Sequence, residues 1–136
     1  MIVGVGVDLC PVSRMRQALS RHDGRFALRV FTAEERDYCQ ARAEPAQHYA
    51  ARFAAKEAFL KALAVPPGLS WHEIAVLSDG NGPPRLQLSG QAAQAAQARG
   101  ASHFHLSMTH AGDSAVAVVI AEQRPSRGGF PSDGGL

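Results

Sequence analysis

The chain has 136 residues, of which 46% are hydrophobic and 19% are charged, and its formal net charge is +2. This length fits one globular domain with a modest core. A binding site that needs more residues to enclose it would include residues of a second subunit. The charge is too small by itself to indicate nucleic-acid binding, and no apolar stretch approaches the roughly 18 residues of a membrane span. Because the first residues also lack a secretory signal pattern, we expect a soluble, cytoplasmic protein that binds neither nucleic acid nor membranes.

The first predicted element is a strand over residues 2–9 with two different faces. One face carries only apolar side chains, namely Val3, Val5, Val7 and Leu9. The other face carries Gly4, Gly6 and Asp8, and its glycines leave room for a bulky group to approach the backbone. Asp8 is therefore a candidate ligand residue, although an aspartate here could instead cap the helix that follows.

An arginine-rich helix is predicted next, from near Pro11 to about residue 30, with Gly24 weakening its last part. Residues 9–30 hold five arginines against one acid, Asp23, which is a local net charge of +4. The arginines are Arg14, Arg16, Arg21, Arg25 and Arg29. This uneven charge indicates a basic patch for an anionic partner, with a solvated helix face that binds nothing as the alternative.

Two more helices are predicted in the middle of the chain. Thr32 and Glu35 have the spacing of a capping box, so one helix begins there and runs to about Ala43, before a break at Pro45. Residues 47–64 are dense in alanine and contain no glycine or proline, which makes them the strongest helix prediction.

On this long predicted helix, Glu57 and Lys61 lie four residues apart and project from the same face. Such a pair is ordinarily a surface ion pair that contributes about 0.3–0.5 kcal/mol. Arg52 and Lys56 add further charge to a helix that must bury much of its surface. Mg²⁺ held by one or two carboxylates and by substrate phosphates needs this mixture of residue types, so a metal and phosphate site is the other interpretation.

The last part of the chain is predicted to combine strands with one helix. We expect strands over residues 72–77, 85–88, 103–108 and 114–122, a hairpin turn at 79–82 and a helix over 89–99. Hairpin-linked strands among helices predict an α+β fold for one small domain, residues 1–122, in which an antiparallel β-sheet packs against the long helix. Residues 123–136 hold four glycines and two prolines and predict a disordered tail.

Polar side chains gather on one of these strands and in the turn after it. Alternation puts four of them on one face, with His110 in the turn: His103, His105, Ser107 and Thr109. Three histidines suggest zinc, but serine and threonine are poor zinc ligands, and donors for a nucleotide phosphate fit at least as well. A serine–histidine hydrolase is also conceivable, yet the chain has no G-x-S-x-G motif.

Four segments together resemble the holo-acyl-carrier-protein synthase family of phosphopantetheinyl transferases. They are VGVGVDLCPVSRM, FTAEE, ARFAAKEAFLKAL and HFHLSMTHAGDSAVAVVIAE, all within residues 1–122. The resemblance implies the 4'-phosphopantetheinyl transferase fold. It also implies an enzyme that moves the 4'-phosphopantetheine group of coenzyme A to a serine of apo-acyl carrier protein, with adenosine 3',5'-bisphosphate as the second product.

The resemblance also implies roles for individual residues. Asp8 and Glu57 would bind Mg²⁺, which holds the diphosphate of coenzyme A. Lys61 would offset negative charge on the phosphate under attack, and Glu35 would hold a metal-bound water that accepts the serine proton. Coenzyme A would contact Arg52, Lys61, Ser107, Thr109 and His110, and the carrier protein would dock on Arg14, Arg21 and Arg25.

A homotrimer with active sites between subunits is a further implication of the resemblance. Two departures from the family pattern concern the nucleotide site: a stiff loop at residues 64–68 stands where relatives have glycine-threonine-glycine, and Ala111 stands where a polar side chain is common. Two other functions stay open at this point. One is a catalytically weak module that binds acidic helical proteins, and the other is a metal-dependent hydrolase of a nucleotide diphosphate.

Overall fold

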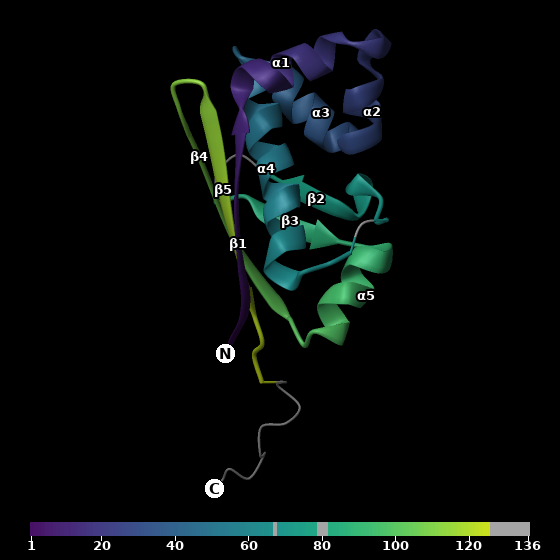
Figure 1. Cartoon of the computed structure of the whole chain (residues 1–136), viewed down its shortest axis with the longest axis vertical. Helices are drawn as coiled ribbons and strands as arrows, with labels where there is room; N and C mark the ends of the chain where they lie inside the picture. Colours follow the sequence, from purple (N-terminus) through teal and green to yellow (C-terminus); the bar gives the residue numbers. More distant parts are fainter. Residues whose placement is uncertain (67, 79–81, 126–136) are drawn as a thin grey trace, which may run out of the picture.

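The structure is a computed structural model that describes residues 1–66, 68–78 and 82–125. Its centre is one long helix, α4 (Pro45–Leu63). Three helices gather at one end of α4 and one lies near its other end (Figure 1): α1 (Val12–Ser20), α2 (Arg25–Val30) and α3 (Ala33–Gln40) at the first end, and α5 (Gly90–Ala98) at the second. The predicted α+β organisation is confirmed.

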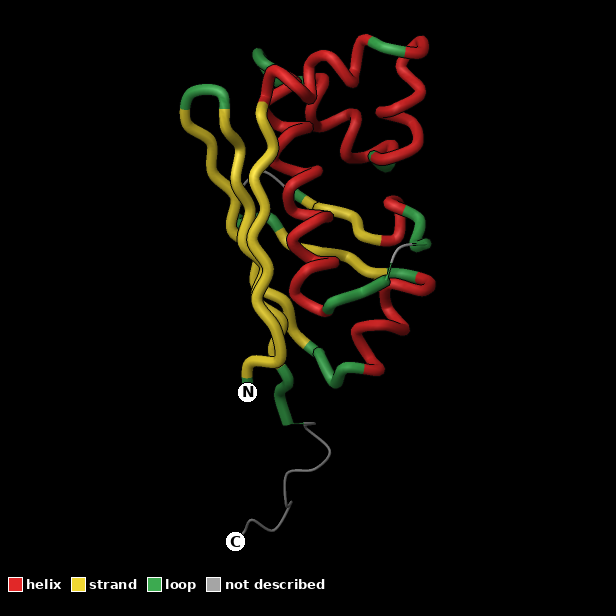
Figure 2. The backbone as a smooth tube through the Cα atoms, viewed as in Figure 1, coloured by secondary structure: helices red, strands yellow, loops and turns green. Residues whose placement is uncertain are grey.

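The strands form two antiparallel sheets rather than the single sheet expected from the sequence. The larger sheet has the order β1-β5-β4, and its three long strands run side by side along one side of the molecule (Figure 2): β1 (Ile2–Pro11), β5 (Ser114–Glu122) and β4 (His103–Ala111). The smaller sheet pairs β2 (Ile74–Leu77) with β3 (Arg85–Leu88). Both sheets contact α4, because this alanine-rich helix is apolar on most sides and needs cover on more than one.

The glycines of β1 face α4, which corrects the expectation that they leave room for a ligand. A Cβ atom at Gly4 would lie 1.8 Å from the Ala62 carbonyl oxygen, and one at Gly6 would lie 1.9 Å from the Ala58 carbonyl oxygen. The backbone of the strand therefore lies directly on the backbone of the helix, which only glycine permits. As a result Asp8, on the same face of β1, lies beside the exposed side of α4.

The arginine-rich segment is not one helix. After α1 the chain turns through Arg21 and a short 3₁₀ helix, η1 (His22–Gly24), before α2 begins. His22 and Asp23 have φ values of 53° and 56°, and Gly24 has 79°, so three successive residues leave the right-handed helical region. The sequence signalled only the glycine, and the break folds α2 back along α1.

The boundaries of the next two helices follow from their caps. The capping box of α3 is confirmed, because Thr32 Oγ1 accepts from the Glu35 amide at 3.1 Å and Glu35 Oε1 accepts from the Thr32 amide at 2.7 Å. Pro45 begins α4 instead of marking a break, since proline fits the first helical turn, where its missing N–H is not needed. None of the described helices is both long and apolar enough to cross a bilayer.

One strand of the C-terminal hairpin is longer than the sequence indicates. β5 has the predicted bounds, but β4 continues to Ala111, because its last three residues all find partners on β5. Only Gly112, with φ of 58°, and Asp113 form the turn. Gln123, the first residue after β5, exchanges two backbone hydrogen bonds with Met1. Residues 126–136 of the predicted tail and 79–81 of the predicted turn lie outside the described residues.

Candidate functional site

The first candidate site is a group of charged side chains where β1 meets α4. Lys61 Nζ donates hydrogen bonds to Asp8 Oδ1 at 2.8 Å and to the Val7 carbonyl oxygen at 3.1 Å. Burial and the charge of Asp8 raise the pKa of Glu57, and Lys61 opposes them. The structure thus brings together three residues that the sequence singled out. It excludes Asp8 as a helix cap, because Asp8 lies inside β1 and α1 begins only after Pro11.

This carboxylate–lysine group (Asp8, Glu57 and Lys61) suits a small cation that keeps oxygen ligands from elsewhere. The carboxylates are close enough for one to raise the pKa of the other, and two acids with one ammonium leave a net charge of −1 when all are ionised. Among the described residues no cluster of three or more His, Cys, Asp or Glu side chains could hold a metal. A cation here would therefore take further oxygens from water or substrate, as Mg²⁺ commonly does.

The second candidate site is a cavity of about 240 Å³ between α3, the start of α4 and the end of β4. Its lining consists of Tyr38, Gln47, His48, Ala51, Arg52, Ser78, Gly82, Pro84, Met108, Thr109 and His110. This part of the described chain places no acidic side chain on the cavity wall, whereas one arginine and two histidines lie there. We call it the cation-lined cavity, and its chemistry suits a phosphate.

The ring of Tyr38, on the cavity wall, contacts two arginines, of which Arg52 also lines the cavity. The guanidinium carbons of Arg42 and Arg52 lie 3.9 and 4.1 Å from the centre of this ring. Arg52 Nη2 donates to Ser78 Oγ at 2.7 Å, while its buried Nε has no hydrogen-bond partner among the described atoms. Burial, followed by the charges of the two arginines and His110, lowers the pKa of His48. An anion in the cavity would relieve this crowding of positive charge.

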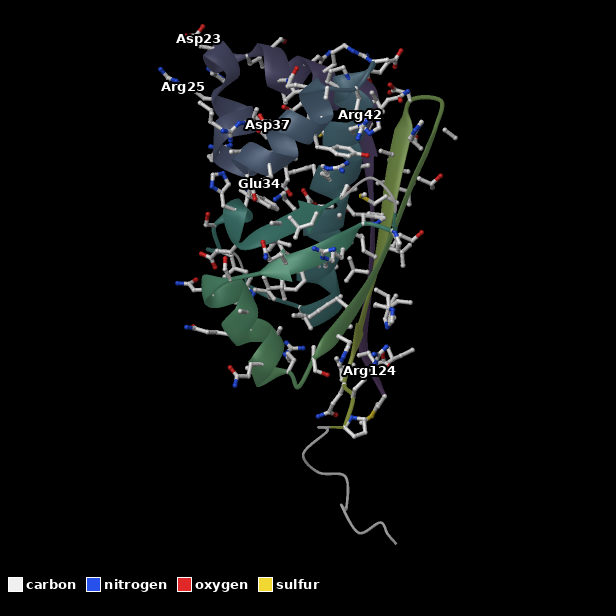
Figure 3. All side chains as sticks on the ribbon, turned by 180° about the vertical axis from the view of Figure 1, so that it is seen from behind. Asp23, Arg25, Glu34, Asp37, Arg42 and Arg124 are labelled. Carbon is white, nitrogen blue, oxygen red and sulfur yellow. The ribbon has the colours of Figure 1, made fainter. Side chains whose placement is uncertain are left out.

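A third candidate surface is basic and lies at the α1–α2 end. A hollow of about 460 Å³ is lined by Ala18, Arg21, His22, Arg25, Phe26 and Arg29. The break after α1 forms this surface, because it brings Arg21, just after α1, beside Arg25 and Arg29 of α2. Arg25 projects outward from this end of the molecule (Figure 3). Arg14, which lies on α1, is not part of the lining.

Comparison with known proteins identifies the family. Residues 4–119 match the sequence model of the 4'-phosphopantetheinyl transferase superfamily. The chain belongs to this superfamily. A holo-[acyl-carrier-protein] synthase of Desulforudis audaxviator is 48% identical over 122 residues, which cover 89% of this chain and 93% of that protein. One from Geobacter metallireducens is 43% identical over 125 residues, which cover 90% of this chain and 99% of that protein.

Solved structures agree with this assignment to the transferase superfamily. The holo-[acyl-carrier-protein] synthase of Neisseria meningitidis superposes with a TM-score of 0.78 and 32% identity, and the match covers 90% of this chain and 100% of that one. The Chronobacterium ammoniagenes ACPS-CoA complex superposes with a TM-score of 0.77 and 34% identity. That match covers 90% of this chain and 98% of that one. The predicted family and the predicted transferase fold are confirmed.

In this member of the superfamily, the predicted coenzyme A residues fall into separate places. Arg52, Thr109 and His110 line the cation-lined cavity. Lys61 lies instead in the carboxylate–lysine group. Ser107 pairs across the sheet with Val118, two residues before Thr109, and is not part of the cavity lining.

The side chains that surround Arg52 were not predicted from the sequence. Tyr38 and Arg42 are four residues apart, and so are His48 and Arg52. Such i,i+4 spacing of an aromatic ring with a cation was a usable signal. It could not reveal that the two pairs meet, because that depends on how α3 and α4 pack.

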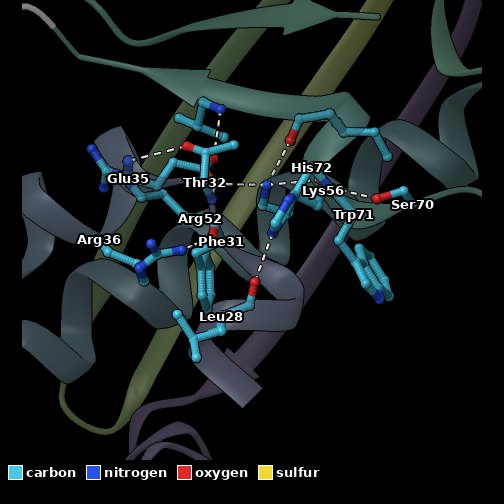
Figure 4. A network of polar contacts seen from close by, with 12 residues as sticks. Leu28, Phe31, Thr32, Glu35, Arg36, Arg52, Lys56, Ser70, Trp71 and His72 are labelled. Atoms are coloured by element: carbon cyan, nitrogen blue, oxygen red, sulfur yellow. Dashed lines mark hydrogen bonds and ion pairs between the residues drawn. The ribbon is translucent and has the colours of Figure 1, made fainter. Parts of the chain in front are cut away.

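The structure contradicts the expectation that Glu35 holds a catalytic water. Its side chain is fully buried, and Lys56 Nζ lies 2.9 Å from its Oε1 (Figure 4). Oε1 also accepts from the Thr32 amide, and Oε2 accepts from the Val76 amide at 2.7 Å. Lys56 donates in addition to the carbonyl oxygens of Trp71 and Ile74. Glu35 therefore ties α3 to α4 and β2, and neither of its oxygens is exposed to solvent, where it could hold a catalytic water.

Proposed function

We propose that this chain is a holo-[acyl-carrier-protein] synthase. It transfers the 4'-phosphopantetheine group of coenzyme A to a serine hydroxyl of an apo-acyl carrier protein. The observation that carries the proposal is the combination of the carboxylate–lysine group with a separate cation-lined cavity suited to phosphate. The similarity to proteins named for this activity, one of them solved as a CoA complex, supports the same reaction.

Asp8 and Glu57 would hold Mg²⁺, since they supply two carboxylates and leave other positions to phosphate oxygens. The ion, when bound, would neutralise charge on the diphosphate and polarise the phosphorus under attack. The hydrogen bond to Asp8 and the charge of that carboxylate raise the pKa of Lys61, so its amine stays protonated. Lys61 therefore stabilises negative charge on the phosphate and does not serve as the base.

In the transfer, the serine oxygen forms a bond to the phosphorus next to the pantetheine arm. The bond between that phosphorus and the bridging oxygen breaks, and adenosine 3',5'-bisphosphate leaves with that oxygen. Arg52, Thr109 and His110 would hold the nucleotide phosphates and keep the reacting phosphorus in line, because catalysis here is chiefly positioning and charge neutralisation. The serine proton goes to a group other than Glu35, whose oxygens are all engaged.

The two parts of this site lie on opposite edges of the larger sheet, which supports sites between subunits. Asp8 is on the edge strand β1 and His110 on the edge strand β4, with β5 between them. Two strand spacings amount to about 10 Å. α4 covers the face between the two edges. A second copy with its β4 edge beside β1 would bring both parts together.

The open face of the same sheet supports a homotrimer. Val5, Val7 and Leu9 are exposed to 57%, 54% and 54%, and they line up across the sheet with apolar residues of β5. A contiguous apolar face of this kind marks an interface in a soluble protein. In a homotrimer, other copies of the chain would bury this face.

Shared sites predict recovery of activity in mixtures. Asp8→Ala and His110→Ala each damage one half of the site, so either variant alone should be nearly inactive. Co-expression should restore a measurable fraction of wild-type transfer, because some interfaces in mixed oligomers combine two intact halves. A mixture no more active than its components would contradict sites built from two subunits.

The carrier protein would dock on Arg21 and Arg25, which line the basic hollow, and on Arg14 of α1. Its acidic helix would be the anionic partner of these arginines. Arg14→Glu should raise the KM for the carrier and leave the KM for coenzyme A nearly unchanged. Arg99→Glu changes the same charge at the exposed end of α5 and serves as the matched control. An unchanged carrier KM for Arg14→Glu would contradict this docking surface.

We also propose the cytoplasm as the site of this activity. Cys10 and Cys39 are both free and buried. Burial raises their pKa values to about 11 and about 12, so both remain protonated thiols. Free thiols are typical of reducing compartments, which supports this location.

The direct test is mass spectrometry of an apo-acyl carrier protein incubated with the enzyme, coenzyme A and Mg²⁺. The carrier should gain one phosphopantetheine with the wild type and not with Asp8→Ala or Glu57→Ala. Asp37→Ala removes an exposed acid of α3 and should stay active. Carrier binding without mass gain would instead indicate a docking module. Release of adenosine 3',5'-bisphosphate without any carrier would indicate a hydrolase.

A further inference from the structure

The cap of α1 comes from the other end of the chain. Pro11 occupies the N-cap position and its side chain accepts no hydrogen bond from the helix. Asp113 supplies the missing acceptors: Oδ1 accepts from the Ser13 amide at 2.9 Å and Oδ2 accepts from Ser13 Oγ at 2.6 Å. The Asp113 carbonyl oxygen accepts from the Val12 amide at 2.7 Å. Three otherwise unsatisfied donors at the start of α1 are thus held by one residue of the β4–β5 turn.

Strand pairing fixes this contact. Pro11, the last residue of β1, pairs with Ser114, the first residue of β5. Asp113 therefore follows directly from the register of the sheet, at the point where β1 gives way to α1. The turn that carries it has only two residues, and the positive φ of Gly112 lets it close tightly.

The two elements joined by Asp113 carry different parts of the proposed site. The last part of β4 carries Thr109 and His110, which line the cation-lined cavity two or three residues before the turn. α1 begins one residue before Ser13 and carries Arg14. The turn is therefore a direct mechanical link between a nucleotide-binding strand and a carrier-docking helix.

We infer that Asp113 is a positioning residue, which fixes the carrier-docking helix α1 in register with the nucleotide-binding end of β4. This inference rests on the proposed function, because it concerns how the two substrates of that reaction are aligned. A carrier docked on α1 must present its serine in line with the diphosphate, and a misplacement of about 1 Å can cost on the order of 100-fold in rate. A helix with a loose first turn would hold its arginines less accurately.

Electrostatics alone makes the opposite prediction, so the two roles can be separated. Asp113 and Ser13 are exposed, and Asp113 is an acid at the start of a basic helix. If it acted only through its charge, it would repel an acidic carrier, and removing it would lower the carrier KM. If it acts as the cap, removing it raises the carrier KM.

The test compares Asp113→Ala with Asp113→Asn. Both changes remove the charge, but asparagine is as good an N-cap as aspartate and can still accept from the Ser13 amide. Asp113→Ala should raise the carrier KM about three- to tenfold, the range expected when a cap is lost, with the KM for coenzyme A changed less than twofold. Asp113→Asn should stay within about twofold of the wild type. Ser13→Ala, which keeps the amide contact, should lie between these two variants.

A carrier KM for Asp113→Ala that is unchanged or lower overturns the inference, as does equal impairment of the alanine and asparagine variants. An equal rise in both KM values would indicate general loosening and also overturns it. Arg14→Ala measured in the same assay separates this failure from failure of the proposed function. If Arg14→Ala raises the carrier KM and Asp113→Ala does not, only the positioning role fails. If the wild type transfers nothing to a carrier, the proposed function fails and takes this inference with it.

Discussion

Helix α4 carries the lysines of two lysine–carboxylate pairs, which have almost the same nitrogen–oxygen distance and differ in their surroundings. Lys56 lies 2.9 Å from Glu35 with both side chains fully buried, whereas Lys61 lies 2.8 Å from Asp8 with 56% and 13% of the side chains exposed. In the first pair every carboxylate oxygen and every ammonium hydrogen has a partner within the protein. Its bonds join α3, α4 and β2.

The second pair is incomplete. Glu57 adds a second carboxylate beside Asp8, so one ammonium faces two acids, and burial and the charge of Asp8 raise the pKa of Glu57. A fully satisfied pair can stabilise a fold but has nothing left to offer a ligand. The second pair, with Glu57 beside it, keeps charge that is not neutralised within the protein and can bind a cation and a phosphate. Carboxylates with perturbed pKa values are also typical of functional sites. The first pair therefore maintains the architecture in which the second can act.

The largest expected effect is on stability, from breaking the buried pair. Lys56→Met would leave Glu35 buried without its cation, and should lower the free energy of unfolding by about 3–5 kcal/mol. Urea denaturation followed by circular dichroism measures this. Lys61→Met, at the exposed pair, is the matched control and should change stability by less than about 1 kcal/mol. Similar losses for the two variants would remove the distinction between the pairs.

The next effect concerns the contact that sets Asp8 beside α4. Gly6→Ala places a Cβ against the Ala58 carbonyl oxygen and should separate β1 from the helix. Overpacking of this kind costs about 1–3 kcal/mol. Transfer activity should fall further than stability predicts, because Asp8 moves with its strand. Gln87→Ala, on an exposed position of β3, should change neither the melting temperature nor the activity.

The pH dependence of the transfer rate tests whether Glu57, beside the exposed pair, binds the cation. Glu57 has a raised pKa, so its ionised form, the one able to bind a cation, is lost at a higher pH than for an ordinary carboxylate as the solution is acidified. At limiting Mg²⁺, the transfer rate should fall on the acid side through this raised pKa, and saturating Mg²⁺ should move the fall to lower pH. A profile with the same acid limb at both Mg²⁺ concentrations would contradict the role of Glu57 as a ligand.

The smallest predicted effect lies in the cation-lined cavity. Tyr38→Leu removes the ring that holds Arg42 and Arg52, and should raise the KM for coenzyme A about two- to tenfold, as expected for lost cation–π contacts. Tyr38→Phe keeps the ring and should remain within about twofold of the wild type. Steady-state kinetics at saturating carrier provide the measurement. Equal effects of the two variants would show that the hydroxyl matters rather than the ring.

Much of the fold could be predicted because its signals are local. The capping box of α3 depends on residues three apart, and the bounds of β5 follow from its own alternation. The grouping of Asp8 with Glu57 and Lys61 could be expected from their residue types in the family pattern. Each of these predictions needed only a short stretch of chain or a characteristic motif.

The features that could not be predicted from the sequence depend on packing between distant segments. Glycines at positions 4 and 6 leave the same gap whether a ligand or a helix fills it, and here α4 does. From the sequence, Glu35 could cap its helix or act in proton transfer. The structure favours the structural role, because Lys56 Nζ lies 2.9 Å from its Oε1. Asp113 lies 100 residues from Ser13, so its role as a cap has no local signal.

The most direct test of the division between the two pairs is carrier modification by Glu57→Gln and Glu35→Gln, measured side by side. The measurement is transfer rate per folded molecule at low temperature, with the folded fraction taken from circular dichroism. Glu57→Gln should remain folded and lose transfer by about 100-fold or more, because a metal ion contributes several kcal/mol of charge stabilisation and would be held less well. Glu35→Gln should be less stable but keep transfer within about threefold per folded molecule. A stable Glu35→Gln variant without activity, or an active Glu57→Gln variant, would contradict the account.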